Sequence, residues 1–149
     1  MNLDLSEVRR RFAAAPVARL ATVGPAGQPH LVPVTFAVDG DHVYTAVDAK
    51  PKRTSDLRRL RNIAVDPRVA LLADHYEADW AELWWARADG TASVLDRPAD
   101  MAGPLRLLTA RYPQYRASPP AGPVICVQVA RWTGWAASGE TSDSHGEPA

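Results

Sequence analysis

A cluster of positive charge lies where the sequence changes from an extended to a helical pattern. Lys50, Lys52 and Arg53 come just before a run in which apolar side chains recur at helical spacing. The free N–H groups and the dipole at a helix start bind anions, and ammonium and guanidinium groups add contacts to phosphate. Without an anion, cations at a helix start oppose the dipole. The segment therefore favours a phosphate site, and a solvated basic loop is the alternative.

Aromatic side chains form the second group with chemical potential. The chain has five tryptophans, at positions 80, 84, 85, 132 and 135. Tryptophan offers a large contact area at low entropy cost, which indicates an interface or a stacking surface for a flat ligand. Trp84 and Trp85 are adjacent on an expected strand, so they point to opposite faces. One should serve the core and the other a groove or a dimer contact.

Residues that could act as acid, base, nucleophile or metal ligand are sparse. His30, His42 and His75 lack the spacing of a metal site, and no G-x-S-x-G, P-loop or G-x-G-x-x-G motif occurs. The single cysteine, Cys126, lies in an apolar run and is expected to be structural. The pattern is typical of a protein that positions a redox cofactor and leaves the chemistry to it.

Length and composition set the frame for these groups. With 149 residues, the chain fits one domain, which we assign to residues 1–137. Seventeen basic and 17 acidic residues balance, so neither nucleic acid nor membrane is an expected partner. The N-terminus lacks a signal-peptide pattern, which predicts a cytoplasmic protein. Residues 138–149 lack large apolar side chains and are expected to form a disordered tail.

The elements that must position these residues are mostly short strands. Period-two patterns and turn residues predict strands over 17–23, 30–38, 42–47, 68–73, 83–94 and 124–132, with a short seventh over 134–136. Helical patterns cover 5–12, a stretch that starts in the basic segment from Lys50 and is closed by Asp66-Pro67, and a segment after residue 96 that should break at Gly103-Pro104. Asp89-Gly90 is an expected interruption or turn. Short antiparallel strands that bury one face tend to close into a barrel.

Several stretches together resemble a known family. They are Val17–Gly24, Gly27–Val34, Asp79–Trp80, Leu83–Trp85 and Trp132–Trp135. With them the chain resembles the split β-barrel flavin and deazaflavin oxidoreductases of the pyridoxamine-phosphate-oxidase-like superfamily, and most of all their F420-dependent branch from actinobacteria. The resemblance implies a mainly β fold, a six- to seven-stranded antiparallel split barrel of the FMN-binding type with flanking helices.

The same resemblance implies a place for the cofactor ring. Pro33, Val34 and Thr35 would lie beside the ring, and Thr45 would face the same groove. Independently, a proline within a strand lacks an N–H and marks a sheet edge or a bulge. The residues around Pro33 are thus expected to offer an opened backbone to a flat ligand.

The phosphate of the cofactor is placed by the same comparison. Lys50, Lys52 and Arg53 occupy the position of the basic residues that bind it in the family. Arg59 could supply one of these contacts instead. Family members are homodimers with two equivalent sites at the subunit interface, so Trp85 and Tyr76 would close the groove from the partner subunit.

The function expected from the resemblance is hydride transfer between reduced F420 and a small electron-poor organic substrate. Solvent water, His30 or Tyr44 could deliver the accompanying proton. One alternative is an FMN-dependent enzyme of the pyridoxamine-phosphate-oxidase type, against which the sequence shows no clear site for a substrate phosphate. Another is a protein that binds F420 or flavin without turnover.

Overall fold

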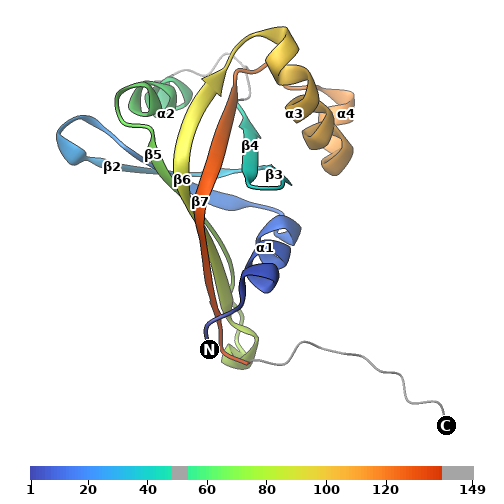
Figure 1. Cartoon of the computed structure of the whole chain (residues 1–149). Coiled ribbons are helices and arrows are strands. Elements are labelled where there is room, and N and C mark those ends of the chain that lie inside the picture. Colours follow the sequence, from blue (N-terminus) through green and yellow to red (C-terminus); the bar gives the residue numbers. More distant parts are fainter. Residues whose placement is uncertain (48–53, 139–149) are drawn as a thin grey trace.

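The computed structural model describes residues 1–47 and 54–138, without the side chains of 54–57. Seven strands of this described part form one antiparallel sheet in the order β2-β1-β5-β6-β7-β4-β3 (Figure 1). The strands are β1 (Ala18–Val23), β2 (Pro29–Val34), β3 (Ala37–Asp39), β4 (His42–Ala46), β5 (Arg68–His75), β6 (Trp84–Leu95) and β7 (Val124–Ala136). The mainly β, seven-stranded architecture with flanking helices confirms the predicted fold class.

Four helices flank the sheet in the described part of the chain. They are α1 (Leu5–Ala14), α2 (Thr54–Val65), α3 (Pro98–Arg111) and α4 (Pro113–Ala117), with single 3-10 turns at Pro25–Gly27 and Trp80–Glu82. Helices α1 and α2 contribute side chains to the main core, while α3 packs against β3 and β4 in a second cluster, to which α4 adds Tyr115. Figure 1 shows where the four helices lie around the sheet. The two pairs of helices therefore serve different surfaces.

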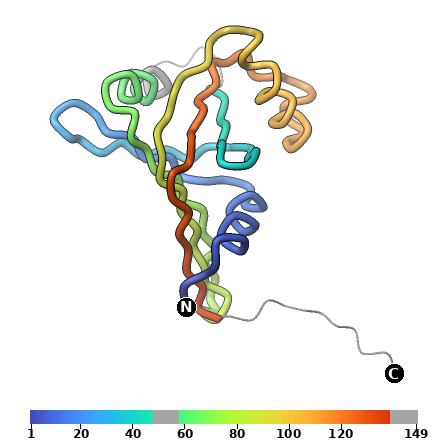
Figure 2. The backbone as a smooth tube through the Cα atoms, in the orientation of Figure 1, coloured from blue at the N-terminus to red at the C-terminus, as the bar shows by residue number. Residues whose placement is uncertain are grey.

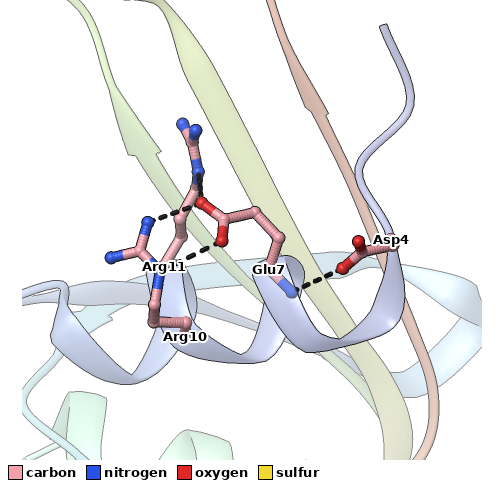
Figure 3. A network of polar contacts seen from close by, with 4 residues as sticks. All are labelled: Asp4, Glu7, Arg10 and Arg11. Carbon is pink, nitrogen blue, oxygen red and sulfur yellow. Dashed lines mark hydrogen bonds and ion pairs between the residues drawn. The ribbon is translucent and has the colours of Figure 1, made fainter. Parts of the chain in front are cut away.

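Helix α1 begins at a capped turn and carries its own ion-pair network. The Asp4 carboxylate accepts a hydrogen bond from the Glu7 N–H at 2.9 Å, which satisfies one free donor of the first turn. The Glu7 carboxylate in turn accepts from Arg10 and Arg11 one turn later (Figure 3). Val8 and Phe12, on the opposite side, are buried in the core.

The long strands β5, β6 and β7 form a twisted ribbon along the length of the molecule (Figure 2). The predicted interruption at Asp89-Gly90 is confirmed as a register shift in the pairing of β6 with β7. A Cβ at Gly90 would lie 2.1 Å from the Gln128 carbonyl oxygen. Glycine is therefore needed where the two backbones approach.

The predicted break at Gly103-Pro104 is wrong, because α3 continues through Pro104 to Arg111. Pro104 is buried, and Leu108 one turn later is fully buried in the cluster over β3 and β4. The burial of Pro104 and Leu108 favours the continuous helix against the roughly 3 kcal/mol that an interior proline costs. The helix ends instead before Pro113.

The short seventh strand predicted over 134–136 is also wrong as a separate element. Strand β7 runs unbroken from Val124 to Ala136. A Cβ at Gly134 would lie 2.9 Å from both the Trp85 carbonyl oxygen and a methyl of Val8. The glycine thus lets α1 and β6 approach β7 and does not end the strand.

No helix of residues 1–47 and 54–138 is long and apolar enough to cross a membrane. The predicted tail lies outside the described residues from 139 onward, so it stays a prediction.

Candidate functional site

The two edges of the sheet meet at a two-residue corner. Strands β2 and β3 lie at opposite ends of the strand order, yet only Thr35 and Phe36 connect them. Three Cα steps span at most ~11 Å, so the sheet must curl until its edges meet there. The single strand predicted over 30–38 is therefore wrong: the chain changes from one edge to the other at Thr35-Phe36.

The corner is held by side chains from α3 and the turn after it. The Tyr112 hydroxyl accepts from the Phe36 N–H at 3.1 Å, and its one proton is shared between the carbonyl oxygens of Phe36, at 3.0 Å, and Pro16, at 3.1 Å. Arg111 donates to the Phe36 carbonyl at 2.6 Å and to the carbonyl of Ala15. Because Phe36 is fully buried, these bonds satisfy backbone groups that have no place in the sheet ladder. The sequence held no local signal for this arrangement.

The residues predicted to line the ring divide between the two sides of β2. Pro33 is exposed, Val34 is buried in the core, and Thr35 is partly buried. Strand β2 is an edge strand, which confirms that interpretation of its proline. Only Pro33 and Thr35 thus present side chains toward solvent, and Val34 can reach a ligand only through its backbone.

The side chain of Thr45 is more deeply buried than that of a residue expected to face a groove. Its side chain is 1% exposed, on the same side of β4 as the core residue Val43. Its neighbour Tyr44 points the other way and stacks on His42, with ring centroids 6.1 Å apart. Burial, with Cys126 and Asp39 nearby, raises the pKa of Tyr44 above its ordinary value, so the phenol stays protonated at neutral pH.

The predicted phosphate residues Lys50, Lys52 and Arg53 lie outside the described residues. Helix α2 begins directly after them at Thr54, where a helix start was expected. Arg59 lies on α2 and is partly buried.

His30 on β2 is partly buried close to two arginines of α2. Burial, together with Arg58 and Arg59, lowers the pKa of His30 below its ordinary value, so the ring is neutral at pH 7. Its Nδ1 atom is buried and has no hydrogen-bond partner among the described residues. The region between β2 and α2 thus holds two arginines and a buried polar atom that lacks a partner among the described residues.

Trp85 lies on the outward face of the ribbon. In the register it stands between Trp135 on β7 and Asp74 on β5. The Arg87 guanidinium lies 5.7 Å from its ring, within cation–π distance. Trp85, Arg87 and Asp74 line a hollow of about 340 Å³ together with Leu72 and Tyr76, among others. Trp84 points to the core side. Of the two adjacent tryptophans, Trp84 therefore packs against the core and Trp85 lies on the outward face.

A second hollow of about 560 Å³ lies between the end of α1 and the tip of the β5–β6 hairpin. Its lining includes Arg10, Arg11 and Trp84, and both arginines are bonded to Glu7. The Arg11 guanidinium lies 5.7 Å from the Trp84 ring. The Glu7 carboxylate therefore offsets one of the two guanidinium charges within α1.

Among residues 1–47 and 54–138, no group of three or more histidine, cysteine, aspartate or glutamate side chains is arranged to hold a metal ion. Cys126 is partly buried on β7, and burial raises the pKa of its thiol.

Comparison with protein families gives a match over nearly the whole chain. The family model described as pyridoxamine 5′-phosphate oxidase matches residues 5–136. A 5a,11a-dehydrotetracycline/5a,11a-dehydrooxytetracycline reductase from Streptomyces rimosus is 41% identical over 56 residues. That match covers 38% of this chain and 38% of the length of the curated relative.

Solved structures share the fold. A conserved hypothetical protein from Mycobacterium tuberculosis superimposes with a TM-score of 0.73 at 21% identity, covering 91% of this chain and 86% of that one. A FAD-binding protein from Mesorhizobium loti gives a TM-score of 0.69 at 18% identity, covering 90% and 95%. At these identities the likeness shows the architecture alone.

Proposed function

The chain belongs to the pyridoxamine 5′-phosphate oxidase family of split-barrel oxidoreductases, and we propose that it uses reduced coenzyme F420 to reduce a small electron-poor organic substrate. The observation that carries the reductive direction is the aligned relative from Streptomyces rimosus, whose name describes a reductase. The F420 assignment rests on the sequence resemblance to the F420-dependent branch. When bound, the deazaflavin would supply the hydride.

The described residues fit such a cofactor at two points. The edge strand β2 ends in an outward segment, Pro33 and Thr35, whose free edge suits a flat ring. The charges of Arg58 and Arg59 on α2, which help to lower the pKa of His30, suit the anionic part of the cofactor near α2. Lys50, Lys52 and Arg53, with Arg59 as an alternative, would hold the phosphate.

The protein groups near this segment would bind and orient rather than react. His30 lies on the opposite face of β2 from Pro33, and Tyr44 is raised in pKa and packed under α3. Neither is well placed to give a proton to a substrate stacked over a ring at Pro33. Solvent water is therefore the proposed proton source.

A homodimer would complete the site. The outward face around Trp85 carries exposed apolar side chains, with Leu72 37% and Leu31 65% exposed, and charged pairs such as Arg19 with Asp74 between them. This mixture suits a face that a second copy covers. Trp85 and Tyr76 of one subunit would close the groove of the other.

Side-by-side titration with F420 and FMN, followed by quenching of tryptophan fluorescence, tests the proposal. Wild-type protein should prefer F420, and a Lys50→Ala, Lys52→Ala variant should lose at least tenfold in affinity, which corresponds to about 1.4 kcal/mol. An Arg97→Ala, Arg106→Ala variant removes two exposed charges elsewhere, around the start and middle of α3, and should bind like wild type.

A preference for FMN would contradict the F420 assignment and favour the FMN-dependent, oxidase-type alternative. Binding of neither cofactor would contradict any flavin or deazaflavin chemistry for this chain. Tight F420 binding without reduction of any acceptor in a screen would favour a binding protein without turnover. The flavin alternative is included because one protein of similar structure is described as FAD-binding.

A further inference from the structure

Two side-chain hydroxyls meet at the barrel corner. The Tyr115 Oη atom lies 2.6 Å from the Thr35 Oγ1 atom, and both side chains are partly buried. Neither hydroxyl has another hydrogen-bond partner among the described residues. The bonds of Tyr112 and Arg111 satisfy the buried backbone of Phe36, but no backbone group depends on the bond between Tyr115 and Thr35.

Either hydroxyl can donate in this pair, and the chemistry favours one direction. A phenol is a stronger acid than an aliphatic alcohol and is therefore the better hydrogen-bond donor, which favours donation from Tyr115 to Thr35. A threonine hydroxyl has one proton and two lone pairs. Once Thr35 accepts from Tyr115, its own proton is free to point to a third group.

That third group must lie on the outward side of the corner. Val34 and Phe36, the neighbours of Thr35, are buried, so alternation along the extended chain turns Thr35 away from the core. The exposed Pro33 is on the same side. This is the segment on which the proposed function places the cofactor ring.

We propose that Tyr115 is a positioning residue that makes Thr35 a hydrogen-bond donor to the cofactor ring. The inference rests on the proposed function, and it applies equally to F420 and FMN, because both carry a dione ring with carbonyl and nitrogen acceptors. Thr35 contacts the ring, and Tyr115 acts through Thr35.

Tyr115 packs against a second tyrosine that is itself hydrogen-bonded to the backbone. Its ring meets that of Tyr112 edge-on, with centroids 5.7 Å apart and an interplanar angle of 69°. Tyr112 is itself bonded to the corner backbone and to the Pro16 carbonyl at 3.1 Å. A donor held by packed neighbours loses little entropy when a ligand binds.

The test uses Tyr115→Phe, Thr35→Val, the double variant and Thr35→Ser, with three readouts: the dissociation constant, the absorption spectrum of bound cofactor and the Tm. Loss of one hydrogen bond should weaken binding about fivefold in each of the first two variants. Both should also shift the absorption maximum. The double variant should bind no more weakly than Thr35→Val, and Thr35→Ser should keep wild-type affinity.

A lower Tm for Tyr115→Phe with unchanged affinity and spectrum would overturn the proposal and leave the proposed function intact. Additive losses in the double variant would also overturn it. If Tyr115→Phe does not fold, the contrast between Thr35→Val and Thr35→Ser decides, since equal binding by both contradicts a donor role for Thr35. Wild-type protein that binds neither cofactor would contradict the proposed function and this inference together.

Discussion

The Asn62 side-chain amide donates a 3.0 Å hydrogen bond to the Thr22 hydroxyl, and both side chains are almost fully buried, at 3% and 2% exposed. The bond joins α2 to β1 and so fixes the helix that follows the basic segment. Asn62→Leu should lower the free energy of unfolding by about 1–3 kcal/mol, because the Thr22 hydroxyl stays buried without its partner. Urea denaturation measures the change.

The matched control for that bond is the double variant Asn62→Leu, Thr22→Val. With both polar groups removed, part of the lost stability should return. Equal stability of Asn62→Leu and wild type would show that this bond does not anchor α2.

A side chain at Gly90 should be poorly tolerated. Its Cβ would lie 2.1 Å from the Gln128 carbonyl oxygen, so Gly90→Ala must displace backbone and should cost about 2–3 kcal/mol. Gly103→Ala is the control, because the nearest atom to its Cβ, on Arg106, is 3.8 Å away and alanine favours a helix. Thermal unfolding of both variants should give opposite shifts in Tm, and equal shifts would contradict the bulge geometry.

Acid should remove the stability that the network on α1 contributes. The hydrogen bonds from Arg10 and Arg11 lower the pKa of Glu7 from 4.5 to about 2. A depressed carboxyl pKa stabilises the fold above pH 4.5, and that contribution disappears as the pH falls from 4.5 to 2. After allowance for solvent screening it amounts to about 1 kcal/mol.

Glu7→Gln should remove this part of the pH dependence. Chemical denaturation at pH 2.5 and pH 6 measures it, with Glu82→Gln, an exposed carboxyl site, as the control. If wild type and Glu7→Gln lose equal stability between the two pH values, the network does not act as described.

A charge introduced into the proposed dimer face should have a different effect from a charge introduced at an equally exposed leucine elsewhere. Leu72 on the ribbon is 37% exposed and Leu107 on α3 is 38% exposed, which makes them matched sites. Leu72→Asp should convert a dimer to a monomer in light scattering after gel filtration, because it buries a charge at the interface. Leu107→Asp should leave the mass unchanged. A monomeric wild type, or a dimer in both variants, would refute this interface.

The strands and hairpins were largely predictable because their signals are local. Asp39-Gly40-Asp41 is a typical hairpin turn, and Gly40 has the positive φ of 58° that such a turn requires. The corner at Thr35-Phe36 was not predictable in this way. Its hydrogen bonds come from Tyr112 and Tyr115, 76 and 80 residues further along the chain. Only tertiary packing brings them together.

The candidate site was predictable to a similar extent. The proline in β2 correctly indicated an edge strand, and Trp85 lies on an outward face with a hollow beside it. Arg87, which lies over Trp85, was missed because a single arginine in a strand gives no sequence signal. Thr45 fits the alternation of a strand, but the alternation alone does not say which face is the core.

A crystal structure of the protein with bound F420 tests the central claim most directly. We predict a dimer in which the deazaflavin ring lies against the outward side of Pro33 and Thr35 and the phosphate contacts Lys50, Lys52 or Arg53. Trp85 of the partner subunit should close the groove. A ring bound elsewhere, for example in the hollow at the end of α1, would contradict the proposed site.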